Sequence, residues 1–136
     1  MFGGKKNGAS KPQNRIDSLI GAGTRLEGNV QFSGGLRIDG EIKGNVEAAQ
    51  DQPSTLVVSE HARIEGVINV AHVVINGTVI GPVHATETLE LQPCAKVTGD
   101  VEYNSLEMQQ GAVVQGRLIH QSNAKTVELK LAASSN

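Results

Sequence analysis

The chain has 136 residues, enough for one domain with tails. Its aromatic residues are Phe2, Phe32 and Tyr103 alone, so the core must be aliphatic and thin, which disfavours a sandwich or a barrel of this length. The formal net charge of −2 divides into +4 for residues 1–15 and −6 for the remainder, and this acidic body has no basic patch interleaved with aromatic residues, which argues against nucleic-acid binding.

Residues 1–15, MFGGKKNGASKPQNR, are predicted to form a disordered basic tail. The tail is either a solubilising leader or a membrane anchor, in which Met1 and Phe2 enter the acyl boundary while Lys5 and Lys6 meet anionic head groups. Each basic residue contributes about 1 kcal/mol near an anionic leaflet, and full burial of a large apolar side chain contributes roughly 1.5 to 3 kcal/mol. One tail would therefore bind weakly, whereas many tails on one polymer would bind well.

Residues 16–120 contain a repeated motif in which every second position is, in order, a small residue, an apolar residue, glycine and an apolar residue. The motif occurs six times, and its glycines are Gly28, Gly44, Gly66, Gly81, Gly99 and Gly116. Successive glycines are 15 to 18 residues apart, except for one step of 22. Each copy has the two-residue period of a strand and no helical period. We therefore predict an all-β fold, a single-stranded triangular β-solenoid of about six coils with these glycines at its corners.

Two features modify the repeat. The step of 22 residues contains the polar, proline-bearing stretch 47–55, which we predict to be a loop inserted into the solenoid. The apolar residues of some coils have even numbers and those of others have odd numbers, and we expect one such change at every coil boundary. In a continuous strand a shift of one residue would turn the apolar side chains outward, whereas a corner between coils can turn them inward again. Residues 121–136 are predicted to be a C-terminal tail with a candidate short strand at 126–131.

Neither end of the repeat shows a helix or a polar capping coil. An open end of a solenoid presents unpaired strand edges and a bare apolar core. We therefore predict end-to-end assembly. With a rise of about 4.8 Å for each coil, six coils make a rod on the order of 30 Å long, and joined rods make a filament.

Residues that could carry chemistry are few. Cys94 is the only cysteine, which excludes an intramolecular disulfide and a thiolate metal cluster and indicates a reducing compartment. Neither a signal-peptide apolar region nor a run of eighteen apolar residues occurs, so we expect neither export by that route nor a membrane span. The glycines open no helix and therefore form no phosphate cradle. We predict no catalytic residue, no cofactor, no metal site and no enzymatic activity.

The four histidines were the strongest candidates for metal ligands. They are His61, His72, His84 and His120. Their spacings of 11, 12 and 36 residues match neither a coil nor a local metal-binding motif, so we interpret them as surface residues.

Three classes of function remain open at this point. The first is a self-assembling scaffold, and the second is a closed trimeric left-handed β-helix enzyme, either a hexapeptide acyltransferase or carbonic-anhydrase-like, with a ligand between subunits. The third is a monomeric adaptor. The acyltransferases need an aliphatic residue at every sixth position, and a walk from Leu36 fails at Ser54 and Glu60. Size under native conditions separates the three classes.

The repeats Leu36-x-Ile38-x-Gly40-x-Ile42 and Leu89-x-Leu91-x-Pro93-x-Ala95-x-Val97 are similar to those of the bactofilin family. The resemblance covers residues 16–120, and the Met-Phe-x-x-Lys-Lys start resembles the family's membrane-targeting leader. It implies a bacterial cytoskeletal protein, a right-handed β-helix that polymerises without nucleotide into non-polar filaments on the cytoplasmic face of the inner membrane. It also implies a scaffold that positions peptidoglycan-synthesising or hydrolysing enzymes and influences cell shape.

One departure limits this comparison, because family members often have a large aromatic residue near the carboxyl-terminal assembly surface, and the last coil offers aliphatic residues there. We therefore assign the polymerisation interface by position only. The first coil contributes Leu26, Val30 and Phe32, and the last coil contributes Val114, Leu118 and Ile119. The expected partners are other copies of the chain, an anionic membrane surface and cell-wall enzymes, with no nucleic acid and no nucleotide.

Overall fold

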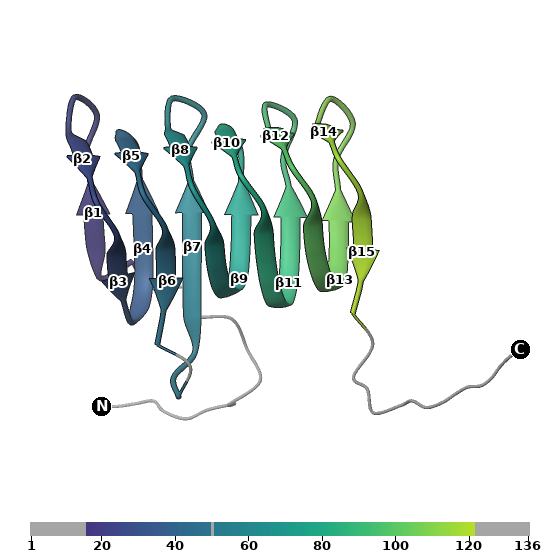
Figure 1. Cartoon of the computed structure of the whole chain (residues 1–136), viewed down its shortest axis with the longest axis horizontal. Coiled ribbons are helices and arrows are strands. Elements are labelled where there is room, and N and C mark those ends of the chain that lie inside the picture. Colours follow the sequence, from purple (N-terminus) through teal and green to yellow (C-terminus); the bar gives the residue numbers. More distant parts are fainter. Residues whose placement is uncertain (1–15, 50, 122–136) are drawn as a thin grey trace, which may run out of the picture.

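A computed structural model describes residues 16–49 and 51–121, so the predicted tail at 1–15 and the candidate strand at 126–131 lie outside the described residues. Within them the chain forms fifteen strands and no helix, stacked side by side into one solenoid (Figure 1). The strands are β1 (Ser18–Ile20), β2 (Arg25–Glu27), β3 (Val30–Phe32), β4 (Gly34–Ile38), β5 (Glu41–Lys43), β6 (Val46–Ala48), β7 (Ser54–Val58), β8 (Arg63–Glu65), β9 (Ile68–Ile75), β10 (Thr78–Ile80), β11 (Val83–Leu91), β12 (Lys96–Thr98), β13 (Val101–Met108), β14 (Val113–Gln115) and β15 (Leu118–His120). The described residues contain no helix with the length and apolarity needed to cross a membrane.

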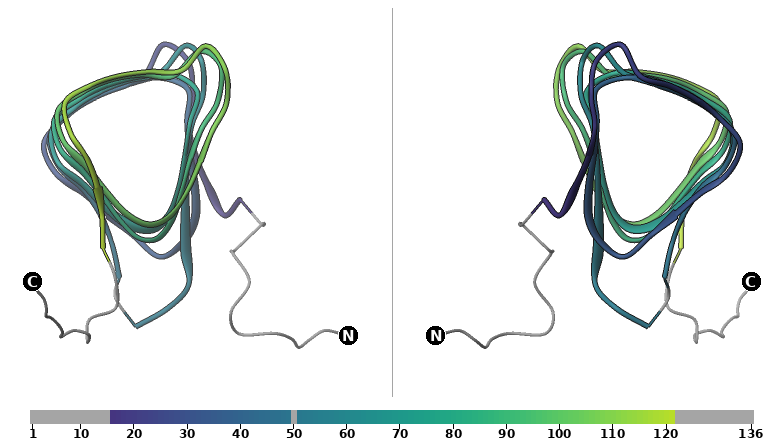
Figure 2. Two further views of the ribbon diagram at one scale, coloured as in Figure 1. Left: turned by 90° about the vertical axis from the view of Figure 1, so that its right-hand side faces the viewer. Right: turned by 90° about the vertical axis from the view of Figure 1, so that its left-hand side faces the viewer.

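The strands form two parallel sheets that wrap around a triangular core. Sheet B contains one three-residue strand from each of six coils, in the order β14-β12-β10-β8-β5-β2. Sheet A contains the other nine strands and covers the two remaining sides of the triangle, because β9, β11 and β13 bend around the corner between those sides. Viewed from its C-terminal end, the chain turns anticlockwise as it approaches the viewer (Figure 2). The solenoid is therefore right-handed.

The core consists of columns of equivalent side chains from successive coils. Twenty-one apolar side chains are buried, and all of them are leucine, isoleucine, valine or alanine. In sheet B, for example, Ile42, Ile64, Val79 and Val97 follow one another in register. Strand alternation places every second residue inside, so each coil adds one aliphatic layer to the core. The predicted all-β solenoid with a thin aliphatic core is confirmed.

The predicted corner glycines lie where one coil passes directly over the next. A Cβ built on Gly66 would lie only 2.1 Å from the carbonyl oxygen of Gly44 in the preceding coil, and φ at Gly66 is +153°. No side chain fits this space. Two further glycines have the same role at another corner: a Cβ on Gly40 would lie 2.4 Å from the Thr24 oxygen, and one on Gly77 would lie 2.1 Å from the Ser59 oxygen. The repeat pattern indicated only that these two positions are small.

The predicted changes of parity are only partly correct. A change occurs where two residues turn the corner between sheet A's two sides, as between Val70 and Val73. The next coil has one additional residue at that corner, seen as a shift of register after Ala85, so Leu89 remains on an odd number. The prediction of one change at every boundary is wrong, because this corner has two residues in some coils, as between Val70 and Val73, and three in others, as between Ala85 and Leu89.

The insertion is shorter in the structure than the loop predicted at residues 47–55. Strand β6 continues to Ala48 and β7 begins at Ser54. The hydroxyl of Ser54 accepts a hydrogen bond from the backbone N–H of Ala71 at 3.2 Å, which holds the start of β7 against the next coil. Both ends of the predicted loop therefore belong to the sheet.

Candidate assembly surfaces

The exposed large apolar side chains of the described residues all belong to the first and last coils. The fractions exposed are 42% for Ile16, 60% for Leu19, 37% for Leu26, 43% for Met108, 45% for Val113 and 46% for Leu118. The four coils between them bury most of their aliphatic residues and expose no large one. Exposed apolar surface gathered at defined places marks interaction sites. Leu26, Met108 and Leu118 lie over core columns at the two ends of the rod, whereas Leu19 and Val113 align with Arg37 and Lys96 and face outward from its sides.

Within residues 16–49 and 51–121, each end also presents strands that have a neighbour on one side only. At the N-terminal end β1, β2 and β3 pair with β4, β5 and β6. At the C-terminal end β14 pairs with β12, and β15 pairs with the first part of β13. The free side of such a strand carries unpaired N–H and C=O groups, which are a template for pairing with another chain.

The structure places five of the six predicted interface residues on top of core columns. In the first coil, Leu26, Val30 and Phe32 align with Ile42, Val46 and Ala48. In the last coil, Val114 aligns with Val97 and Leu118 with Val101. Ile119 differs, because it aligns with Glu102 on the outer surface of the solenoid. It therefore lies beside the end layer and not within it.

Further residues of the same end layers were absent from our sequence-based assignment. Ile20 aligns with Ile38, whereas Leu106 and Met108 align with Leu89 and Leu91. These residues could have been found by continuing the two-residue alternation of the strands from the core positions to the ends of the chain. His120 aligns with Tyr103, and the centroids of the two rings are 5.8 Å apart. The C-terminal end thus carries an aromatic pair where only aliphatic residues were expected.

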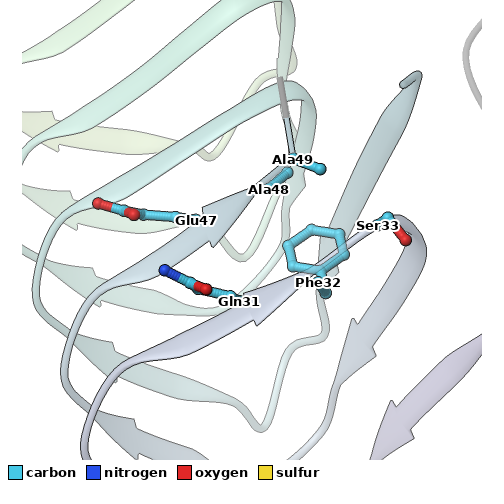
Figure 3. Close-up of a pocket in the computed structure, with 6 residues that line it drawn as sticks. All are labelled: Gln31, Phe32, Ser33, Glu47, Ala48 and Ala49. Atoms are coloured by element: carbon cyan, nitrogen blue, oxygen red, sulfur yellow. The ribbon is translucent and has the colours of Figure 1, made fainter. Parts of the chain in front are cut away.

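Phe32 also lines a hollow of about 490 Å³ at the corner where the insertion leaves the solenoid. The phenyl ring and Ala48 point to one side of their strands, whereas Gln31 and Glu47 point to the other (Figure 3). Among the described residues that line the hollow, Glu47 is the only titratable one. The described lining therefore combines apolar and polar side chains and contains no pair of acid and base groups.

A comparison with protein families agrees with these open ends. Residues 18–119, three quarters of the chain, match the model of the family described as "Bactofilin: Polymer-forming cytoskeletal". The chain belongs to the bactofilin family. This bactofilin is therefore a member of a polymer-forming cytoskeletal family, in which self-association is the shared property.

Two curated relatives are similar to this bactofilin, both from Myxococcus xanthus (strain DK1622). Bactofilin BacP is 23% identical over 109 residues, which cover 80% of this chain and 44% of BacP. Bactofilin BacO is 26% identical over 102 residues, which cover 75% of this chain and 78% of BacO. The chain thus spans less than half the length of BacP. No solved structure matches it.

The histidines of this bactofilin lie apart from one another. Among the described residues no group of three or more His, Cys, Asp or Glu side chains is placed to hold a metal ion. His84 lies 3.2 Å from the Glu102 carboxylate, and His120 Nε2 lies 2.9 Å from the carbonyl oxygen of Asn104. The interpretation of all four histidines as surface residues is wrong for His72, which is buried, with only 8% of its surface exposed. The turn between Val70 and Val73 packs it between neighbouring coils instead of turning it to solvent.

Buried polar contacts surround His72. Its Nδ1 lies 2.8 Å from the Thr88 hydroxyl of the next coil, and Thr55 aligns with it in the preceding coil. Burial lowers the pKa of His72 below its ordinary value of 6.5, while the negative charge of Glu87 acts in the opposite direction. The imidazole is therefore neutral in the folded chain at neutral pH.

This burial predicts a loss of stability in mild acid. The unfolded chain protonates His72 near pH 6.5 whereas the folded chain resists protonation, so the free energy of unfolding falls as pH drops from 6.5 to the lower folded pKa. The slope for one proton is at most about 1.4 kcal/mol per pH unit. Thermal melting of the wild type and of His72→Gln between pH 7.5 and 5 measures the effect. The same pH dependence in both proteins would contradict the assignment to His72.

Two carboxylates with lowered pKa values tie neighbouring coils together. Hydrogen bonds from the Arg117 side chain and backbone lower the pKa of Asp100, with N···O distances of 2.9 Å to its two oxygens. A hydrogen bond from the Ser59 hydroxyl, assisted by Arg37, lowers the pKa of Asp39. Both carboxylates are ionised at neutral pH. Asp100 thereby holds Arg117, at the corner of the last coil, against the preceding coil, and the last coil carries the C-terminal end surface.

Proposed function

We propose that this bactofilin is a cytoskeletal scaffold that assembles end to end into nucleotide-independent, non-polar filaments on the cytoplasmic face of the inner membrane. The filaments position enzymes that synthesise or hydrolyse peptidoglycan and so influence cell shape. The observation that carries the proposal is the confinement of exposed large apolar side chains to the first and last coils of the described solenoid. The polymer-forming character of the family supports it.

Assembly at these ends follows from the same forces that stack the coils. Each internal coil buries its aliphatic layer between two neighbours, whereas within the described residues Leu26 and Leu118 have a neighbouring layer on one side only. Covering such a leucine contributes roughly 1.5 to 3 kcal/mol. A second copy placed on an end supplies both the missing apolar layer and partners for the free strand edges.

The first experiment is negative-stain microscopy and pelleting of the purified full chain without nucleotide or metal, beside a form that lacks residues 1–15. We expect filaments from both proteins, because the end surfaces belong to the solenoid. A uniform small trimer in both would contradict the scaffold and favour a closed enzyme. A monodisperse monomer would favour an adaptor.

The membrane anchor gives a separate prediction. Met1, Phe2, Lys5 and Lys6 are the residues that we propose contact the membrane, and they lie outside the described residues. Flotation with vesicles that contain anionic lipid is expected to recover polymer of the full chain and to lose it when residues 1–15 are removed. Lys5→Glu/Lys6→Glu is expected to weaken flotation by at least tenfold, at about 1 kcal/mol for each basic residue and repeated along the polymer.

Neutral vesicles provide the control for the charge contribution, and Phe2→Ser tests the apolar contribution. Equal flotation of the full and shortened chains would show that the solenoid itself binds lipid or that the tail is only a solubilising leader. The cell-wall partners are tested by recovery of peptidoglycan enzymes with wild-type filaments and their absence with an assembly-deficient variant.

A further inference from the structure

Sheet B carries a regular pattern of charge over its first three strands. The outward residues of β2, β5 and β8 are Arg25 and Glu27, Glu41 and Lys43, and Arg63 and Glu65. Strand register places Arg25 beside Glu41 and Glu41 beside Arg63, while the second column alternates in the opposite sense. Three positive and three negative side chains thus alternate along both directions of the sheet.

Contacts within the described chain use only part of this pattern. Arg63 Nε donates to Glu65 at 2.9 Å, whereas Arg25 lies 3.7 Å from Glu41 and 3.9 Å from Glu27. Lys43 makes no ion pair with any described residue, although it stands between two carboxylates of its own column. The side chains of the ion-paired residues are between 36% and 70% exposed, so their charges remain accessible to another molecule.

The other half of sheet B has a different surface. Its outward residues are Thr78, Ile80, Lys96, Thr98, Val113 and Gln115, of which Lys96 alone is charged. They line a shallow hollow of about 290 Å³. Val113 is 45% exposed. Sheet B therefore divides along the solenoid into a charged half and a nearly uncharged half.

Sheet B is also a side of the triangle that the other described segments leave free. The described chain starts before β1 and finishes after β15 at the corner opposite sheet B (Figure 2). Strand β6 ends and β7 begins near that same corner. No described segment crosses sheet B, and all six of its strands pair in register without a bulge.

We propose that sheet B is the surface through which two polymers associate side by side, with a second copy of this chain as its occupant. The two copies lie parallel, related by a twofold axis that runs along the solenoid above the centre of the sheet. Such an axis exchanges the two outward columns. Arg25 then faces Glu27 of the second copy, Glu41 faces Lys43, and Arg63 faces Glu65, each contact occurring twice as an isologous interface requires.

The direction of the contact follows from the division of the sheet. In the parallel arrangement the charged half meets the charged half with opposite signs opposed, and the uncharged half meets the uncharged half. Full antiparallel overlap would place Arg25 and Glu27 over Val113 and Gln115, which leaves desolvated charges without partners. Like charges in apposition are strongly unfavourable, so the pattern selects one register as well as one direction.

The predicted contact area between two subunits is small, so stable association requires many such contacts along two polymers. Six strands about 4.8 Å apart and three residues of about 3.3 Å each cover roughly 300 Å² on each copy. Stable protein interfaces use about 800 Å² per partner. A single pair of subunits is therefore weakly held, and repetition along two filaments supplies the remaining affinity. This inference rests on the proposed end-to-end assembly.

The test uses two charge-reversal variants and their combination. Arg25→Glu/Lys43→Glu/Arg63→Glu makes the charged half wholly acidic, and Glu27→Lys/Glu41→Lys/Glu65→Lys makes it wholly basic. Combining all six substitutions inverts every sign and restores the alternation. Glu47→Lys/Glu102→Lys alters charge on another side of the triangle and serves as the control. Thermal melting by circular dichroism checks that each variant is folded, and electron microscopy measures filament width at low and high salt.

Wild-type filaments are expected to be two solenoids wide at about 0.05 M salt and one solenoid wide near 1 M, where the screening length falls to about 3 Å. Each triple variant alone is expected to give single filaments, whereas the sixfold variant, the control and an equal mixture of the two triples give paired filaments. Paired filaments from both triples alone, or wild-type filaments that are single at low salt, would overturn the inference and leave the end-to-end scaffold intact. The absence of any wild-type filament would overturn both.

Discussion

Leu118→Arg is expected to convert long polymer into short oligomers without unfolding the solenoid. Leu118 continues a core column above Val101 and is 46% exposed, so assembly has to bury it. Loss of its burial removes about 1.5 to 3 kcal/mol, and an unpaired charge in the contact adds a further penalty. Since 1.4 kcal/mol is a factor of ten, the concentration needed for polymer is expected to rise by roughly a hundredfold or more. Pelleting across a range of protein concentrations measures this.

Ile119→Arg provides a matched control in the same three-residue strand. Ile119 aligns with Glu102 on the outer surface, so its replacement introduces the same charge one residue away without entering the end layer. We expect it to pellet like the wild type. If both variants pelleted fully, the C-terminal end would not be an assembly surface. If Ile119→Arg alone were deficient, the contact would lie on the side of the last coil.

Gly66→Ala is expected to destabilise the folded solenoid severely. The new Cβ would lie 2.1 Å from the Gly44 carbonyl oxygen, and the two coils cannot separate there without losing the hydrogen bonds and core layers on either side. Backbone rather than a flexible side chain opposes the methyl group. A loss of about 4 kcal/mol or more is expected, which is a large part of the 5 to 15 kcal/mol typical of a domain. Thermal unfolding followed by circular dichroism would show a shift of at least about 15 °C.

Gly28→Ala is the matched control at the equivalent corner of the first coil. Its φ is +135°, which costs an alanine roughly 1 to 3 kcal/mol, but a Cβ there has nothing within 4 Å, since Gly28 lies in the first coil of the described residues. We expect a folded protein with a modestly lower melting temperature. Equal destabilisation by the two substitutions would show that backbone conformation, and not the close approach of coils, requires the glycines.

The strict alternation of small, apolar and glycine residues was sufficient to predict the coils, the glycine corners and the thin core. It succeeds because a solenoid is nearly one-dimensional: each coil contacts only its neighbours, so a pattern local in sequence specifies a contact local in space. The recurrence of Gly44 and Gly66 at one place in the motif already reflects one coil lying on the next. The same logic led to the prediction of open ends, because neither end of the repeat shows the sequence pattern of a helix or of a polar capping coil.

Residues at corners could not be assigned in this way. His72 was interpreted as a surface residue because its number breaks the alternation, yet a two-residue turn packs it against Thr88. Ile119 follows Leu118 in an apolar pair, and only the pairing of β15 with β13 shows that one faces the end layer and the other faces outward. A corner of two or three residues reverses the direction of a side chain, and sequence alone does not reveal its length.

By itself the sequence determined the repeat, the aliphatic layers and the family to which the chain belongs, since each depends on spacing along the chain. Tertiary structure decided which residues stand side by side on different coils. The alternation of Arg25, Glu41 and Arg63 is invisible in the sequence, where they are separated by steps of unequal length. Only stacking brings these charges into one column, because the corners between them absorb the difference in length before the strands come back into register.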